Sequence, residues 1–196
     1  MIDMMIVAVT DRKHCKDLME QIGSMTDLDA VILREKDLDP KEYLELAKTI
    51  KKVCENKGMK FIINTFIDVA RELKVGSIQL PLDIFRNEHD ETSYFDPIWV
   101  SVHSVEEAIE AEKLGADLII YGNVFETACK PGAGPKGLKE LERVCSSVDI
   151  PVLGIGGINV ENASSVVKAG ARGVCIMSGL MDTDRPSDLI SRIRDV

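Results

Sequence analysis

Apolar residues along this chain gather in eight short runs in which they do not alternate with polar residues. The runs are Met4–Val9, Ala30–Leu33, Lys60–Ile63, Gly76–Leu80, Ile98–Val102, Leu118–Tyr121, Val152–Ile155 and Gly173–Ile176. Runs without alternation are typical of strands buried on both faces, as in a parallel sheet. The pattern therefore predicts eight parallel strands.

Between these runs, apolar positions recur with the spacing of amphipathic helices. Asp39 and Pro40 suit a helix start, and Glu42 completes a capping box. Asn159 is expected to cap the helix that follows the seventh run. The predicted helices are His14–Met25, Asp39–Asn56, Phe66–Leu73, Ser104–Leu114, Leu138–Ser146, Glu161–Ala169 and Pro186–Arg194.

The alternation of strands and helices predicts a single (β/α)8 TIM barrel that spans residues 1–196 as one domain. Leu82–Asp96 is rich in Asp, Glu and Asn, so we expect a degenerate unit there, a loop with at most one helical turn. At 196 residues the barrel is a small variant of this fold.

Charge and composition exclude several classes of function. The chain has 24 Lys and Arg against 33 Asp and Glu, a net charge of −9, which argues against nucleic-acid or anionic-membrane partners. No apolar run reaches the length of a membrane span, and the N-terminus lacks the basic region of a signal peptide. The five cysteines are widely spaced without a CxxC pair. We expect a cytoplasmic protein without disulfides or structural zinc.

Two glycine turns follow the last two predicted strands. Gly156 and Gly157 end the seventh strand, and Ser178 with the glycine after it ends the eighth. Loops at these places in a barrel frequently bind phosphate through backbone amides. A tight turn is an equal alternative for the first pair taken alone, but the two turns together favour a phosphate site at Gly156, Gly157, Met177 and Ser178.

Polar residues also follow the other predicted strands. Arg34 and Lys36 are two positions apart and can face one anion, although the interleaved Glu35 slightly favours a solvated charge run. His103 can act as a general acid or base, but a structural role is commoner for a lone histidine. No cluster of His, Asp and Glu predicts a metal site. Asn64, Gln79 and Ser101 end the third, fourth and fifth strands.

The loop after the sixth strand is long, which is uncommon in compact domains unless the loop is functional or mobile. It holds Asn123, Glu126, Cys129 and Lys130. Glu126 and Lys130 offer a carboxylate and an ammonium for proton transfer or charge neutralisation. Cys129 has no neighbouring histidine in sequence, so a plain thiol is favoured over a nucleophile.

Seven segments together resemble the family of thiamine phosphate synthase and the related TenI protein, a thiazole tautomerase. They are VTDR at 9–12, LREKDL at 33–38, IIN at 62–64, VHSVEEA at 102–108, YGNVFETACKPG at 121–132, IPVLGIGGI at 150–158 and AGARGVCIMSGL at 169–180. The resemblance extends through nearly the whole chain. It implies a barrel fold and a role in making the thiazole half of thiamine.

Some positions separate the two branches of this family. In the synthase, a glutamine, an aspartate and an acidic loop hold a pyrimidine diphosphate and magnesium, and here those positions are Ile32, Thr65 and a loop with only Asp83. The segments QLP, VFETACK and MSG are similar to the TenI branch. Where TenI-like tautomerases have histidine this chain has Asn123, which cannot carry a proton near neutral pH.

The resemblance thus implies a TenI-like tautomerase, an isomerase that makes a carboxythiazole phosphate aromatic by proton transfer without a cofactor. Thiamine phosphate synthase with magnesium is the alternative, and a phosphate-metabolite-binding barrel without catalysis is the second. The substrate is a small thiazole phosphate, and a homo-oligomer is compatible with a barrel of this size. The residues assigned are Lys130, Glu126, Asn123 and Lys36 to catalysis, Arg34, Asn64, Gln79, Ser101 and His103 to substrate binding, and Gly156, Gly157, Met177 and Ser178 to phosphate.

Overall fold

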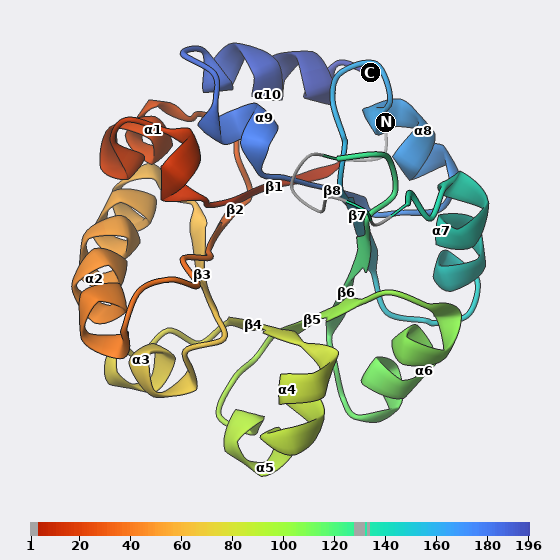
Figure 1. The fold of residues 1–196 in the computed structure, drawn as a ribbon, viewed down its shortest axis with the longest axis horizontal. Coiled ribbons are helices and arrows are strands. Elements are labelled where there is room, and N and C mark those ends of the chain that lie inside the picture. Colours follow the sequence, from red (N-terminus) through yellow and green to blue (C-terminus); the bar gives the residue numbers. More distant parts are fainter. Residues whose placement is uncertain (1–3, 128–131, 133) are drawn as a thin grey trace.

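Eight parallel strands close into a barrel in the order of the sequence, as the computed structural model shows in Figure 1. The structure describes residues 4–127, 132 and 134–196. The strands are β1 (Met5–Val9), β2 (Ala30–Leu33), β3 (Lys60–Asn64), β4 (Ile78–Pro81), β5 (Ile98–Val102), β6 (Leu118–Gly122), β7 (Val152–Ile155) and β8 (Gly173–Ile176). The predicted (β/α)8 barrel is confirmed.

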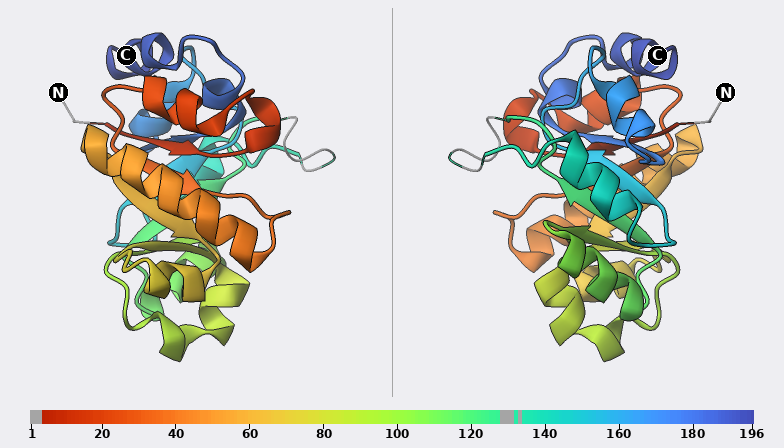
Figure 2. Two further views of the ribbon diagram at one scale, coloured as in Figure 1. Left: turned by 90° about the vertical axis from the view of Figure 1, so that its left-hand side faces the viewer. Right: turned by 90° about the vertical axis from the view of Figure 1, so that its right-hand side faces the viewer.

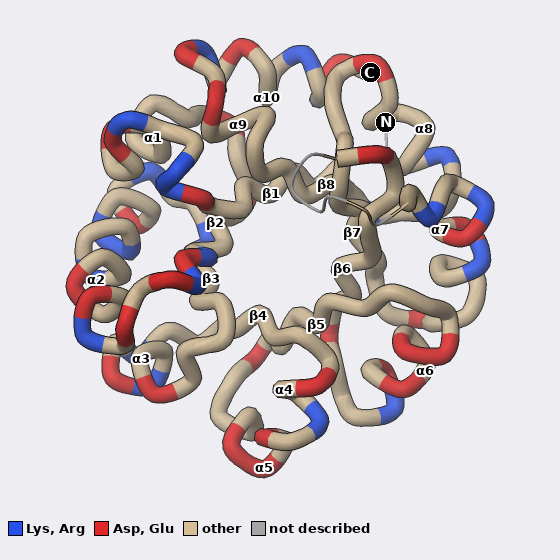
Figure 3. Tube along the Cα trace, in the orientation of Figure 1, with Lys and Arg blue, Asp and Glu red and all other residues tan. Residues whose placement is uncertain are grey.

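Helices form an outer ring around this barrel, and α2 runs along the outside of the strands in Figure 2. They are η1 (Arg12–His14), α1 (Leu18–Ser24), α2 (Pro40–Lys57), α3 (Ile67–Glu72), α4 (Leu82–Asn87), α5 (His89–Thr92), α6 (Val105–Lys113), α7 (Leu138–Cys145), α8 (Ala163–Lys168), α9 (Ser178–Met181) and α10 (Pro186–Arg194). Charged residues lie mainly on these helices and the loops (Figure 3). Among the described residues, no helix combines the length and apolar character needed to cross a bilayer.

The predicted start of α2 is confirmed in detail. The Asp39 side chain accepts a hydrogen bond from Glu42 N, and the Glu42 carboxylate accepts one from Asp39 N, which completes the capping box. The helix ends at Gly58, whose φ of 69° is in the left-handed region where glycine is favoured. Local sequence thus fixes both ends of the helix that covers β2 and β3.

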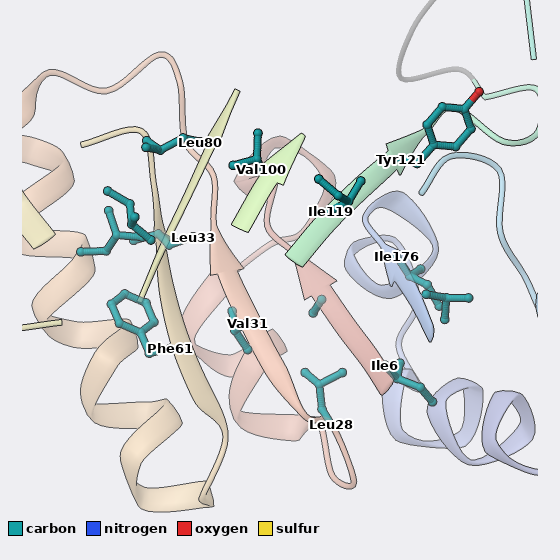
Figure 4. Packing of buried hydrophobic residues seen from close by; sticks show 14 of the residues in the cluster. Ile6, Leu28, Val31, Leu33, Phe61, Leu80, Val100, Ile119, Tyr121 and Ile176 are labelled. Atoms are coloured by element: carbon teal, nitrogen blue, oxygen red, sulfur yellow. The ribbon is translucent and has the colours of Figure 1, made fainter. Parts of the chain in front are cut away.

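Side chains of each strand alternate between two separate apolar cores, because successive residues of a strand point to opposite faces. Outward-facing residues such as Ile6, Val31 and Val100 pack in the layer between barrel and helices (Figure 4). The interior of the barrel is filled by Val7, Val9, Ala30, Ile32, Ile62, Trp99, Leu118, Ile120, Leu153 and Cys175. The lumen is therefore a packed core, and function must lie at its ends.

The segment Leu82–Asp96 corrects one expectation, because it folds into the two short helices α4 and α5 where a loop was predicted. Leu82 and Phe85 are buried and three positions apart, so they place one face of α4 against the barrel. The many acidic and amide residues around them obscured this short apolar face.

Three other elements differ from the predicted ones by two residues or more at one end. Asn159 does not cap α8: its side chain accepts from Glu161 N in a local turn, and the helix begins only at Ala163. The predicted helix His14–Met25 is divided into the end of η1 and a shorter α1. β4 begins two residues later than predicted, at Ile78. In the first two cases, side chains that bond to nearby backbone compete with helix formation.

Candidate active site at the carboxyl end of the barrel

The alternation of strand side chains brings polar residues together at the carboxyl end of the barrel. Ile32, Ile62 and Trp99 point into the lumen. The residues two positions further on, Arg34, Asn64 and Ser101, keep the same inward direction and therefore surround the mouth. The barrel interior thus forms the apolar floor of a polar site.

A cavity of about 250 Å³ opens at this mouth. Its floor is made by Val9, Ile32, Ile120 and Cys175 from the top of the interior core. Eleven of the thirteen residues assigned from sequence line it: Arg34, Lys36, Asn64, Gln79, Ser101, His103, Asn123, Gly156, Gly157, Met177 and Ser178. Their individual roles stay predictions, but they share one cavity.

The two remaining assigned residues are Glu126 and Lys130. Glu126 is exposed and does not line the cavity. Lys130, like Cys129 beside it, lies outside the described residues. The proposed acid–base role of Glu126 therefore has no support from this geometry, and it stays a prediction.

Arg34 and Lys36 form a pair of cations on one side of the cavity. Burial of Lys36 lowers its pKa, and the positive charge of Arg34 lowers that pKa further, while the carboxylate of Asp83 opposes both effects. Arg34 Nη1 lies 3.9 Å from Met177 Sδ, so the guanidinium reaches across to the loop after β8. The site is therefore electropositive before any ligand binds.

A buried tyrosine from α2 fixes the strand ends that carry this part of the site. The Tyr43 hydroxyl donates to Leu33 O at the end of β2 and accepts from Asn64 N at the end of β3. Burial raises the pKa of Tyr43, so the hydroxyl remains protonated and keeps its role as a donor. The Tyr43 ring also stacks on Phe66, with 4.0 Å between centroids.

Asn64, Gln79 and Ser101 form a hydrogen-bonded row across β3, β4 and β5. Asn64 Nδ2 donates to Gln79 Oε1 over 2.6 Å, and Gln79 Nε2 donates to Ser101 Oγ over 2.8 Å. Asn64 and Gln79 are only 4% and 5% exposed, so this row is firmly held. It presents oriented amide and hydroxyl groups to the cavity above the apolar floor.

His103 lies beside this row, with its Nδ1 atom 2.7 Å from Gly122 O. A carbonyl oxygen only accepts hydrogen bonds, so Nδ1 carries the proton in this contact. The His103 backbone N donates to Glu107 Oε2, which holds the residue at the start of α6. With its proton on Nδ1, the ring has Nε2 as its other hydrogen-bonding atom.

The glycine turns occupy the opposite side of the cavity. Gly156 and Gly157 have φ values of 100° and 65°, and a Cβ added to Gly157 would lie 2.3 Å from Glu126 O. Only glycine fits this turn without displacing the loop after β6. Ser178 and Gly179 begin α9, where backbone N–H groups have no partner within their own helix. These are the features expected of a phosphate-binding rim.

Several cavity residues were missed in the sequence. Pro81 lines the cavity and lies two positions beyond the inward-facing Gln79, so strand alternation was the signal that identifies it. Thr127, from the loop after β6, also lines the cavity, and no periodic pattern marks that residue.

Asn123, which was assigned from the sequence, is buried, and its Nδ2 atom donates to Phe125 O over 3.3 Å.

Comparison with known proteins decides the family. The family model described as thiamine monophosphate synthase matches residues 6–180. The chain belongs to the thiamine monophosphate synthase family. Among relatives in this family, a thiamine-phosphate synthase of Clostridium acetobutylicum is 36% identical, over 95% of this chain and 92% of its own. A thiamine-phosphate synthase of Pyrococcus furiosus is 32% identical, over 97% and 93%.

A solved structure agrees with this placement in the thiamine monophosphate synthase family. Thiamine phosphate pyrophosphorylase from Pyrococcus furiosus has a TM-score of 0.85 with this chain at 29% identity, covering 99% of this chain and 95% of the other. The family membership expected from the sequence is thus confirmed, and it places the chain among enzymes of thiamine biosynthesis.

The branch expected within the family is wrong. The departures at Ile32 and Thr65 favoured a TenI-like tautomerase, yet relatives that match nearly the whole chain at 32 to 36% identity are thiamine-phosphate synthases. These two single substitutions therefore misled the assignment, because the chain is similar to synthases over nearly its full length.

Proposed function

We propose that this protein is a thiamine phosphate synthase, a transferase that joins a pyrimidine diphosphate to a thiazole phosphate and releases pyrophosphate. The names of its relatives support this reaction. The observation that carries it is the arrangement of the cavity, in which Arg34 and Lys36 face the glycine turns at Gly157 and Ser178 across one apolar floor. Two phosphorylated rings need two anion sites of this kind.

Each side of the cavity has a distinct part in the proposed reaction. Arg34 and Lys36 bind the diphosphate and stabilise the negative charge that develops as pyrophosphate leaves. The backbone amides near Gly157 and Ser178 hold the thiazole phosphate. Holding both substrates in one cavity turns their encounter into an intramolecular step, which is a large source of rate acceleration.

Magnesium is the metal that this activity implies. Within the described part of the chain, no three His, Cys, Asp or Glu side chains form a metal site. The carboxylate of Asp83 is near enough for its charge to act on Lys36. Because Mg²⁺ is commonly held by one or two carboxylates together with substrate phosphates and water, an ion that arrives with the diphosphate would need only Asp83 from the protein. Such an ion would neutralise part of the charge on the pyrophosphate.

The test is a coupling assay with purified protein, pyrimidine diphosphate and thiazole phosphate, with and without magnesium. We expect formation of thiamine phosphate and an equal amount of pyrophosphate. Lys36→Gln should reduce this rate by about tenfold or more, because it removes a charge-assisted contact to the leaving group. Lys60→Gln is the matched control, since Lys60 lies at the other end of β3, away from the cavity.

Binding of both substrates without product would contradict the synthase proposal. That result would support the remaining alternative, a barrel that binds phosphorylated metabolites without catalysis. Equal loss of activity in Lys36→Gln and Lys60→Gln would show that general destabilisation, and not the cavity charge, limits the rate.

A further inference from the structure

The segment 34–37 that carries the two cavity cations alternates in both charge and direction. Arg34 and Lys36 line the cavity. Glu35, between them, is only 2% exposed and points away from the cavity towards the loop after β1. A buried carboxylate needs several partners to compensate for its lost hydration, so the groups around Glu35 indicate what it holds in place.

Thr10, at the end of β1, joins this carboxylate to the backbone of the first cation. The Thr10 hydroxyl donates to Glu35 Oε1 over 2.6 Å and accepts from Arg34 N over 2.9 Å. Thr10 is completely buried, so water does not compete for either bond. One hydroxyl therefore fixes the position from which the Arg34 side chain leaves the strand.

Arg12 fastens the other end of the segment. Its backbone N donates to both Glu35 carboxylate oxygens, at 3.1 and 3.2 Å, and its Nη1 lies 3.1 Å from Glu35 Oε2. The same guanidinium makes two parallel bonds to Asp37, at 2.7 and 3.0 Å. The segment is thus tied to the loop after β1 at Arg34, Glu35 and Asp37, on both sides of Lys36.

These hydrogen bonds are needed because the cationic side chains of Arg34 and Lys36 repel each other. Without the bonds, the two side chains would move apart into solvent. We propose that Glu35, acting through Thr10 and Arg12, is a positioning residue that holds Arg34 and Lys36 ready for the diphosphate. Glu35 does not touch the substrate. This inference rests on the proposed function, because that function supplies the diphosphate ligand.

Substitutions of Thr10 give the sharpest test. Thr10→Ser retains the hydroxyl group, whereas Thr10→Val retains the shape of the side chain and removes the hydroxyl group. Binding of inorganic pyrophosphate to wild type, Thr10→Ser and Thr10→Val is measured by calorimetry, together with the melting temperature of each protein. We expect Thr10→Ser to bind within about threefold of wild type and Thr10→Val at least about tenfold more weakly, each corrected for its folded fraction. Glu35→Gln is a second variant and is expected to weaken pyrophosphate binding in the same way.

Steady-state kinetics separates positioning from stability. Thr10→Val should raise KM for the diphosphate substrate clearly more than KM for the thiazole phosphate, because it disturbs both cations on the diphosphate side and only Arg34 reaches the other site; a lower folded fraction does not produce this split. Glu110→Gln is the matched control, since it breaks an exposed carboxylate–guanidinium pair with Arg86 on the outer ring. It should change neither KM.

The positioning role is overturned if folded Thr10→Val binds pyrophosphate as wild type does. It is equally overturned if Thr10→Ser loses as much affinity as Thr10→Val, because the methyl group would then be responsible. Failure of the synthase proposal looks different: wild type makes no thiamine phosphate, while the pyrophosphate affinities of the variants still report on positioning.

Discussion

The guanidinium of Arg34 and the sulfur of Met177 lie 3.9 Å apart across the mouth of the barrel. This contact joins the cation pair after β2 to the glycine-containing loop after β8. Arg34 therefore lies between the proposed diphosphate and thiazole phosphate sites, whereas Lys36 has no such contact within the described residues.

The first prediction is that Arg34→Gln and Lys36→Gln have different kinetic effects. Loss of a charge-assisted hydrogen bond costs about 1.5–3 kcal/mol, or roughly ten- to a hundredfold in binding. Arg34→Gln should raise KM for both substrates, while Lys36→Gln should raise KM for the diphosphate alone. Steady-state kinetics with each substrate varied in turn measures this, and identical profiles for the two variants would contradict it.

The second prediction concerns the buried row of Asn64, Gln79 and Ser101. Gln79→Leu removes the 2.6 Å acceptor of Asn64 Nδ2 and leaves only its 3.4 Å contact with the backbone oxygen of residue 79, and a poorly satisfied buried donor costs about 1–3 kcal/mol. Denaturant unfolding should show this cost as a lower free energy of unfolding for Gln79→Leu than for wild type. Gln79→Glu keeps an acceptor at the same place and should lose clearly less, so equal losses in both variants would argue against the row as the cause.

The third prediction concerns magnesium. Asp83→Asn removes the carboxylate whose charge acts on Lys36, and it should raise the magnesium concentration for half-maximal activity by about tenfold. A magnesium titration of the coupling rate measures this. Asp90→Asn is the control, because the Asp90 side chain is fully exposed on α5. An unchanged titration curve for Asp83→Asn would exclude Asp83 as the protein ligand.

The fourth prediction concerns acid stability. Hydrogen bonds from Arg12, and then from Lys13, lower the pKa of Asp37 from 3.8 to about 2. A carboxyl group whose pKa is lower in the folded state stabilises the protein above pH 3.8, and this contribution disappears as the pH falls towards about 2. The difference in unfolding free energy between wild type and Asp37→Asn should therefore shrink over that window. A difference that does not vary with pH would contradict this assignment.

The fifth prediction concerns barrel closure. A Cβ at Gly173 would lie 2.0 Å from Met5 O, so Gly173→Ala should push β8 away from β1 and cost more than about 3 kcal/mol. Gly23→Ala is the matched control, because a Cβ there meets nothing within 4 Å in α1. It should leave stability unchanged or raise it by about 0.5–1 kcal/mol. Denaturant unfolding of both variants distinguishes these outcomes.

Strand positions and cavity residues were readable from the sequence because they depend on local patterns. Buried runs identified the strands, and the polar residues directly after them, such as Arg34 and Asn64, were expected around one mouth of the barrel. This is why most of the cavity could be predicted before the structure was known. Strand alternation, which was not applied to the sequence, also identifies Pro81.

Features that depend on partners far away in the sequence could not be predicted from local patterns. The interleaved Glu35 looked like part of a solvated charge run, because its partners Thr10 and Arg12 lie 25 and 23 positions away. The short helix α4 was hidden by the acidic residues around its two buried positions. The choice between branches of the family also failed, since Ile32 and Thr65 are two single positions and do not determine the reaction of the whole site.

Closure of the barrel also has a consequence for synthesis of the chain. β1 pairs with β2 on one side and with β8 on the other, so Met5 finds its partner only at Gly173. During translation, the edge of β1 that faces β8 has unpaired backbone groups until β8 has left the ribosome. Exposed strand edges invite pairing with other chains. A nascent chain stalled before Gly173 should therefore recruit chaperones or aggregate more readily than one stalled after β8.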